Sequence, residues 1–316
     1  MEAGLVEQNS VSHEAAPNAD SAASTPLARQ LESEKRRREK LKAKRMPRPE
    51  DTRIITISNQ KGGVGKTTTT VNLATAMARA GMNVLVVDMD PQGNASTALN
   101  IPHPQGTPSI YNVLIEDDEL KNVVYRNPET DGLLVAPSTI DLAGAEIELV
   151  SLVAREQRLT RAIKRYSQYR SQQDLPRLDY IFIDCPPSLG LLTVNAFVAA
   201  SEVLIPIQTE YYALEGLSQL VKNIEMIQLH LNPHLHISTI LLTMFDSRTN
   251  LAVQVADEVR EYFPEQVLDA VIPRNVRISE APSYQQSVLT YDPSSTGALS
   301  YREAAMEIAE RGVKSR

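Results

Sequence analysis

A glycine-rich loop between a short apolar strand and a helix constrains the fold of this chain more than any other feature. The loop reads Lys61-Gly62-Gly63-Val64-Gly65-Lys66-Thr67-Thr68, after a β-branched run at 54–57 and before an Ala-rich helix predicted over 67–80. Glycines let the backbone curl until several N–H groups face one anion, and the helix N-terminus adds its positive dipole end. We predict a phosphate-binding loop in which Lys66 reaches the β- and γ-phosphates and Thr67 ligates Mg²⁺.

Apolar runs without polar alternation follow the loop, as expected for strands covered by helices on both faces. Helical patterns fall between these runs, so the sequence predicts an α/β fold with a doubly wound, mostly parallel sheet. The predicted strands are 54–57, 84–87, 133–135, 180–183, 203–207, 237–242 and 267–272, and the main predicted helices are 67–80, 141–166, 214–231 and 251–262.

Residues 1–50 differ from the nucleotide-binding domain predicted over 51–316. The first 25 residues are small and polar, which is typical of disorder, and a basic cluster ended by Pro47 and Pro49 follows them. This tail is either a solvated, partly helical segment or an arm that binds DNA or a partner. The net charge of -7 means that any DNA binding needs a local basic patch. The cluster comprises Lys35, Arg36, Arg37, Arg38, Lys40, Lys42, Lys44 and Arg45.

Three aspartates stand where predicted strands end. Asp88 and Asp90 follow the strand at 84–87, and Asp184 follows the strand at 180–183. Ligands of doubly wound sheets bind at the carboxyl ends of the strands, where a carboxylate holds Mg²⁺ directly or through water. We therefore take Asp184 and Asp90 as candidate metal-site residues and Asp88 as a structural carboxylate.

The loop departs from the common phosphate-loop pattern, because Gln60 replaces the first glycine and Lys61 follows it. Lys61 does not easily fold back onto its own nucleotide beside Lys66, but it could neutralise transition-state charge in a facing subunit. This form of the loop resembles the deviant Walker A motif of the ParA/MinD superfamily. Further segments resemble the chromosomal ParA/Soj branch, and the resemblance runs from about Arg53 to Arg311. They are residues 88–96, 184–190, 208–216, 243–249 and 272–282.

The resemblance implies a DNA-partitioning ATPase with ATP and Mg²⁺ as ligands and weak intrinsic turnover. ATP would drive a sandwich homodimer that binds double-stranded DNA without sequence preference, and a ParB-type partner would stimulate hydrolysis and release. It further implies a cytoplasmic, nucleoid-associated protein. The single cysteine, Cys185, fits a reducing compartment. No apolar run approaches the ~20 residues that span a bilayer, so no stable membrane insertion is expected.

The resemblance also implies roles for single residues. Lys61, Lys66 and Asp90 would act in catalysis, with Asp90 positioning the attacking water and Asp184 as the Walker B aspartate. Adenine would lie near Met244, Pro273 and Asn275. Glu210 and Glu215 would meet the partner's ribose or Lys61. The DNA contacts would be Arg248 and Arg277, with Arg274 and Lys222 as further candidates.

Three other functions share this scaffold. A MinD-like membrane-cycling ATPase needs a C-terminal amphipathic anchor, whereas residues 301–316 predict a helix packed on its own domain. An iron–sulfur or amide-forming enzyme is disfavoured by the position of Cys185 in the Walker B turn. A regulator of transcription or replication initiation stays open. Residues 164–177 look like an insertion, either a mobile surface loop or a docking site.

Overall fold

The computed structural model describes residues 25–211 and 213–314 and divides the chain into two units, 1–43 and 44–316. The described part of the first unit is helix α2 (Pro26–Lys42), whose N-cap Thr25 accepts a hydrogen bond from the Ala28 N–H at 3.2 Å. The predicted disorder over the first 25 residues lies outside the described residues, apart from Thr25. All strands described here belong to the second unit.

The strands form one seven-stranded sheet in the described part of the chain, ordered β3-β4-β2-β5-β1-β6-β7. Every strand pair is parallel except β3 with β4. The predicted mostly parallel, doubly wound α/β fold is therefore confirmed. The strands are β1 (Arg53–Ile57), β2 (Val84–Asp88), β3 (Tyr125–Arg126), β4 (Leu133–Ala136), β5 (Tyr180–Asp184), β6 (Glu202–Gln208) and β7 (His236–Thr243).

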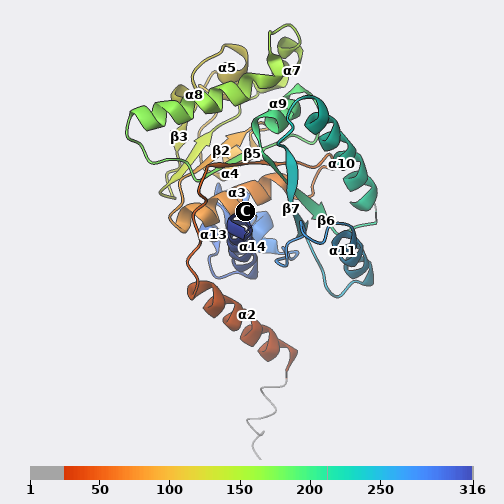
Figure 1. Cartoon of the computed structure of the whole chain (residues 1–316). Helices are drawn as coiled ribbons and strands as arrows, with labels where there is room; N and C mark the ends of the chain where they lie inside the picture. Colours follow the sequence, from red (N-terminus) through yellow and green to blue (C-terminus); the bar gives the residue numbers. More distant parts are fainter. Residues whose placement is uncertain (1–24, 212, 315–316) are drawn as a thin grey trace, which may run out of the picture. The chain divides into compact units, whose positions relative to one another are not determined.

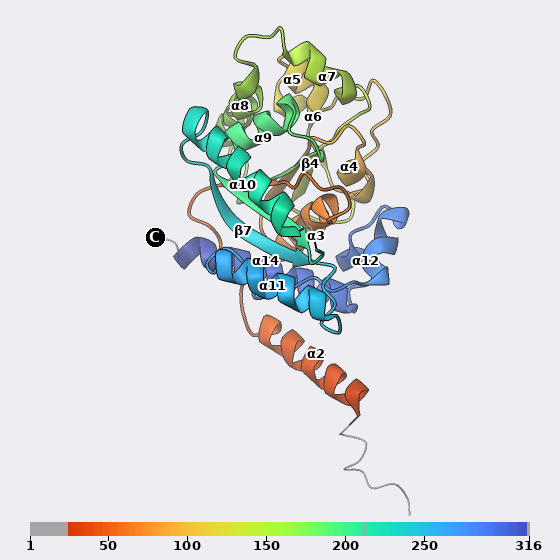
Figure 2. The same cartoon turned by 90° about the vertical axis from the view of Figure 1, so that its right-hand side faces the viewer.

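Helices cover both faces of this sheet (Figures 1 and 2). On one face, Leu85, Val87 and Ile181 share a buried core with α8 and α9, and on the other face α3 packs against α14. Strands buried on both faces need no polar alternation, which explains their sequences. The helices are α3 (Lys66–Arg79), α4 (Asn94–Ala98), α5 (Ile110–Ile115), α6 (Leu120–Val123), α7 (Leu142–Leu149), η1 (Arg155–Gln157), α8 (Arg158–Gln172), α9 (Leu191–Ala199), α10 (Ala213–His230), α11 (Asn250–Tyr262), α12 (Val276–Glu280), η2 (Ala281–Tyr284), α13 (Val288–Tyr291) and α14 (Thr296–Lys314).

The single helix predicted over 141–166 is wrong. The chain forms α7, a turn and η1 before α8 begins at Arg158, and Ala154 has a left-handed backbone with φ 51°. The residues at this break include no strong helix breaker. The helical pattern of the sequence continues through them, and the predicted helix was therefore too long. Packing accompanies the break: α7 and α8 both lie against α5 and α9, and η1 between them also packs on α9.

The segment 164–177 is not a surface loop over its first half, because residues 164–172 complete α8. Tyr166 and Arg170 are buried there. The Arg170 guanidinium donates to the Pro176 carbonyl at 2.6 Å and to the Tyr166 hydroxyl at 3.2 Å. The polar residues between Tyr166 and Arg170 made this segment look like a loop, but it is an amphipathic helix with one buried face.

The strand predicted over 267–272 is also wrong. This segment lies along β7 but makes only isolated bridges, Ile240 with Val267 and Phe245 with Pro273. Its apolar residues Val267 and Ile272 are buried as predicted, but the pairing is too short to form a strand. The short antiparallel β3 carries no such apolar signal and was not predicted.

A buried ion pair fixes the amino-terminal edge of the sheet. Arg53 on β1 donates to both carboxylate oxygens of Glu202 on β6, at 2.7 and 2.6 Å, and to the Ile308 carbonyl at 2.7 Å. The side chains are only 14% and 9% exposed. Burial alone would raise the pKa of Glu202, but the hydrogen bonds and charge of Arg53 outweigh it and hold that pKa below its usual value.

We expect Glu202→Ala to lower the free energy of unfolding by about 3 kcal/mol, because it leaves the Arg53 guanidinium buried without its carboxylate. Glu119→Ala, which removes an exposed pair with Lys121, should cost less than about 1 kcal/mol. Urea titrations of both variants measure the difference. The wild-type advantage should fade as pH falls through the lowered pKa of Glu202, below the ordinary value of 4.5. Equal effects of the two substitutions would contradict the assignment.

Candidate functional site

The glycine-rich loop connects β1 to α3 at the carboxyl edge of the sheet (Figure 1). Gly63 and Gly65 have φ of 75° and 90°, a backbone region that side chains rarely adopt. The Thr243 hydroxyl, at the end of β7, donates to the Val64 carbonyl at 2.8 Å. The loop is therefore held in a curled form from outside, and α3 starts directly behind it, which is the geometry of an anion site.

Lys66 is a buried cation inside this loop. Lys66 is the first residue of α3, and its ammonium donates a hydrogen bond to the Lys61 carbonyl at 3.2 Å. Burial lowers the pKa of Lys66, although the nearby carboxylates of Asp184 and Asp90 oppose this. An ammonium with so little water around it gains most from an anionic ligand in the loop.

The Lys61 side chain is held at the surface by an ion pair. Its ammonium lies 2.7 Å from the Glu210 carboxylate, just after β6, and the pair is exposed by 41% and 47%. The backbone N–H of Lys61 donates to the Asn59 side chain at 3.0 Å, which fixes the first turn of the loop. The two lysines of the loop thus occupy different surroundings: one is buried and the other is held at the surface.

Asp184 lies at the centre of a buried polar cluster below the loop. Its carboxylate accepts hydrogen bonds from the hydroxyls of Thr67 and Thr70, both at 2.8 Å. Burial, followed by the charge of the neighbouring Asp88, raises the pKa of Asp184. A buried carboxylate next to a threonine hydroxyl, with no cation paired to it among the described residues, is a donor set that suits Mg²⁺.

Asp88 and Asp90 differ in environment although they are two residues apart. Asp88 is fully buried and accepts hydrogen bonds from Ser96 N and Oγ, at 2.9 and 2.7 Å, which agrees with a structural role. Asp90 is 8% exposed, and one of its carboxylate oxygens accepts the Gln92 N–H at 3.0 Å. The interaction of the two neighbouring carboxylates adds to burial in raising the pKa of Asp88.

The structure brings the predicted adenine residues together. Met244 follows β7 with φ of 52°, and the next residue, Phe245, pairs with Pro273. Asn275 caps α12 by accepting the Arg277 N–H at 2.8 Å. Met244 and 273–275 therefore form one rim, close to the loop through Thr243. Glu215 is exposed in the first turn of α10, whereas Lys61 pairs with Glu210.

The candidate DNA residues are exposed but only partly grouped. Arg248 is 86% exposed and pairs with Asp246 through two hydrogen bonds of 2.8 and 2.7 Å. Arg248 and Arg274 both lower the pKa of Asp246, so both lie near that carboxylate. Arg277 on α12 pairs with Glu280 and Asp292 instead. Lys222 is exposed on a different element, α10.

Several site residues escaped sequence reasoning. Thr70 follows Thr67 by three residues, so helical spacing could have placed both hydroxyls on Asp184. Asn59 fits a loop-initiating Asn, since its side chain bonds the backbone two residues later. No sequence signal connects Thr243 with Val64, which are far apart in the chain and meet only because β7 ends beside the loop.

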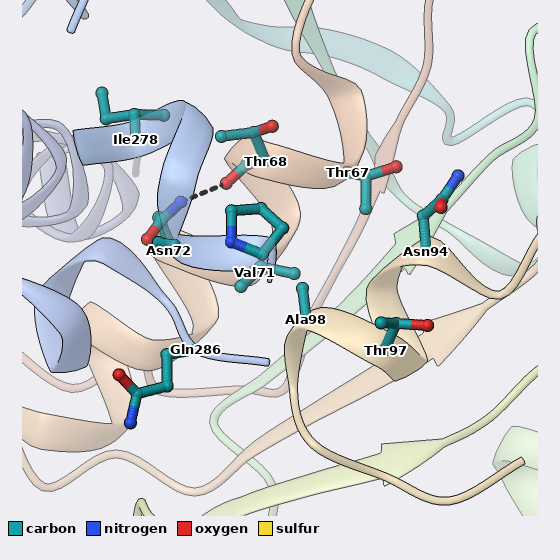
Figure 3. Close-up of a pocket in the computed structure, with 11 residues that line it drawn as sticks. Thr67, Thr68, Val71, Asn72, Asn94, Thr97, Ala98, Ile278 and Gln286 are labelled. Carbon is teal, nitrogen blue, oxygen red and sulfur yellow. Dashed lines mark hydrogen bonds between the residues drawn. The ribbon is translucent and has the colours of Figure 1, made fainter. Parts of the chain in front are cut away.

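A cavity of about 280 Å³ opens against the end of the phosphate loop (Figure 3). Thr67 and Thr68 line one side, Thr97 and Ala98 of α4 another, and Ile278 comes from α12. Inside it, the Asn72 side chain donates to the Thr68 carbonyl at 2.7 Å. The cavity therefore joins the loop to the helix that follows Asp90 and to the helix that carries Arg277.

The C-terminal helix α14 is packed on its own domain, as predicted. Ala304, Ala305, Ile308 and Ala309 are all buried. Among the described residues, none of the helices is both long and apolar enough to cross a bilayer. The membrane-cycling alternative therefore finds no amphipathic anchor in the described part of this helix.

A curled phosphate loop after β1, followed by carboxylates at neighbouring strand ends, defines a P-loop nucleoside triphosphatase of the deviant Walker A class. Solved structures agree. Cobyrinic acid a,c-diamide synthase of Mycobacterium smegmatis with bound ADP and magnesium superposes with a TM-score of 0.67, 36% identity and coverage of 80% of this chain and 92% of that chain. The cell division ATPase MinD of Pyrococcus furiosus gives 0.65 and 26%, covering 84% and 99%.

Sequence relatives narrow the class. The family model described as an AAA domain matches residues 52–237. The chain is 51% identical over 260 residues to the sporulation initiation inhibitor protein Soj of Bacillus subtilis, covering 82% of this chain and 99% of Soj. It is equally identical over 259 residues to the chromosome partitioning protein ParA of Myxococcus xanthus, covering 82% and 88%. The chain therefore belongs to the Soj/ParA family of chromosome-partitioning ATPases.

Proposed function

We propose that this chain hydrolyses ATP in a cycle that couples dimerisation to DNA binding. The observation that carries the proposal is the curled loop with buried Lys66 next to Thr67 and Asp184. Backbone N–H groups and Lys66 bind the triphosphate. Thr67 and Asp184 would hold Mg²⁺, which would neutralise negative charge on the phosphates. Asp90, at the same edge of the sheet, orients the water that attacks the γ-phosphate.

Lys61 links hydrolysis to the second subunit in this proposal. In the single chain its ammonium is held by Glu210 at 2.7 Å, on the exposed rim of the loop. An exposed pair contributes little stability, so the phosphates of a nucleotide in a facing protomer can replace Glu210. The exchange supplies positive charge to the transition state only when two protomers meet.

DNA binding is assigned to Arg248 and Arg277, with Arg274 beside them and Lys222 as a further contact. Their carboxylate partners are exposed or partly exposed, so a phosphate can displace them. The packing supports coupling, because α4, which follows Asp90, lies against η2, and η2 lies against α12, which bears Arg277. A ParB-type partner that speeds hydrolysis would then release the DNA.

We expect Arg248→Glu to lose ATP-dependent DNA binding while keeping ATP-dependent dimerisation. Its salt slope should also fall by about one for each phosphate contact that is lost. Arg260→Glu is a matched control, because Arg260 is a partly exposed arginine on α11 paired with Asp257. Fluorescence anisotropy with a duplex of mixed sequence measures both. Equal affinities of Arg248→Glu and wild type would place the DNA surface elsewhere.

The decisive test of the whole function is DNA co-sedimentation with ATP, ADP and no nucleotide across a salt series. ATP-dependent, salt-sensitive and sequence-independent binding supports partitioning. Pelleting with liposomes only in ATP would support the membrane-cycling alternative instead. An iron–sulfur role finds no support at Cys185, the sole cysteine, because a cluster needs accessible thiolates, whereas this thiol is fully buried and burial raises its pKa. A regulator of transcription or replication initiation would be revealed by a pull-down with the ATP-trapped protein.

A further inference from the structure

Charge is distributed very unevenly along this chain. Residues 29–48 hold ten lysines and arginines against three glutamates, whereas the remainder holds 22 basic and 36 acidic residues. The family match begins at residue 52, and Soj is covered over 99% of its length by only 82% of this chain. The basic segment therefore lies outside the part shared with the family and is the strongest charge complement to a polyanion in the sequence.

Helix α2 arranges part of this charge on one face. Arg29, Ser33, Arg36, Arg37 and Lys40 recur at helical spacing and border one shallow hollow together with Glu32. From residue 29 to residue 40 the helix rises about 16 Å, which matches about five base pairs of one DNA strand.

The glutamates of the helix do not cancel this charge. Glu32 pairs with Arg36 at 2.5 Å, and Glu34 pairs with Arg38 at 3.6 Å, both one helical turn apart. Pairs one helical turn apart stabilise a helix by a few tenths of a kcal/mol. Three glutamates against ten basic residues over 29–48 leave a net positive charge.

The composition of α2 favours DNA over a membrane surface. A helix that lies in a bilayer interface needs a continuous face of large apolar residues, often with aromatic side chains. The large apolar residues of α2 are Leu27, Leu31 and Leu41, and it has no aromatic residue. Lysine and arginine side chains on a polar helix suit repeated phosphates, which require no apolar burial.

We propose that α2 is a second DNA-backbone contact, which works in every nucleotide state. Only Ala43 separates the helix from Lys44, whose ammonium pairs with Glu310 at 2.7 Å on the ATPase domain. DNA that binds weakly to α2 is therefore tethered to the ATPase domain through a short connection, which raises its effective concentration for the ATP-dependent site. The consequence is that hydrolysis weakens the hold on DNA without abolishing it.

The test is DNA binding by the full chain in ADP and without nucleotide, measured by anisotropy in a salt series. The α2 variant combines Arg29→Gln, Arg36→Gln, Arg37→Gln and Lys40→Gln, which keeps helix propensity. The charge-matched control combines Lys121→Gln, Lys164→Gln, Arg165→Gln and Arg260→Gln on the ATPase domain. Basal ATP hydrolysis should be unchanged in the α2 variant, because none of its four positions lies in the nucleotide site.

Three to four phosphate contacts predict that wild-type affinity falls about 40- to 150-fold between about 50 and 200 mM salt. The α2 variant should lose this slope, and the control should keep it. Arg248→Glu should leave nucleotide-free binding intact, which separates this proposal from the ATP-dependent site. An unchanged slope in the α2 variant overturns the proposal. So does wild-type protein that binds vesicles of phosphatidylglycerol but no DNA in ADP.

Discussion

Lys66→Ala should bind ATP about 100-fold more weakly than the wild type, the largest loss expected from any single substitution in this chain. Lys66 is the buried ammonium of the phosphate loop, and charge-assisted hydrogen bonds of this kind contribute about 1.5 to 3 kcal/mol. Burial already lowers the pKa of Lys66, so the empty site gains little from this charge. The charge of Lys66 becomes stabilising only when the phosphates of ATP are bound.

Two measurements separate binding from folding in this variant. Titration with a fluorescent ATP analogue gives the affinity, and thermal unfolding without nucleotide should show that Lys66→Ala is at least as stable as wild type, because a partly desolvated charge has been removed. Lys164→Ala, which removes an exposed lysine on α8, is the matched control and should bind normally. ATP affinity equal to wild type would remove Lys66 from the site.

Asp90→Ala should bind ATP normally and hydrolyse it about 100- to 10,000-fold more slowly, the range associated with loss of a group that handles the attacking water. The dimer should then persist, because the γ-phosphate that holds it stays in place. Phosphate release in a single turnover, together with size-exclusion chromatography in ATP, measures both effects.

Asp88→Ala is the informative contrast, because Asp88 is fully buried and holds Ser96 rather than substrate. This substitution should lower the melting temperature, whereas the protein that stays folded should hydrolyse ATP at close to the wild-type rate. Asp257→Ala, at an exposed carboxylate on α11, should change neither. Unchanged turnover in Asp90→Ala would assign the water to another residue.

The sequence by itself determined the elements that depend on local pattern. Glycines at positions that need positive φ, a lysine and threonine at a helix start and apolar runs of strand length are readable without a fold, because backbone geometry dictates those residue types. The phosphate loop, six of the seven strands and the helices α3, α10 and α11 were predicted within one or two residues. Helix breaks and short bridges were not, because they depend on packing between distant segments.

Tertiary structure alone decided which of these parts meet. The order of strands places Asp88 opposite Asp184, although the two residues are 96 positions apart in the chain. It also sets Thr243 on the loop carbonyl of Val64, holds Lys61 on Glu210 and aligns Phe245 with Pro273. Local sequence cannot encode such contacts, because they follow from how β-strands are ordered and how helices pack over them.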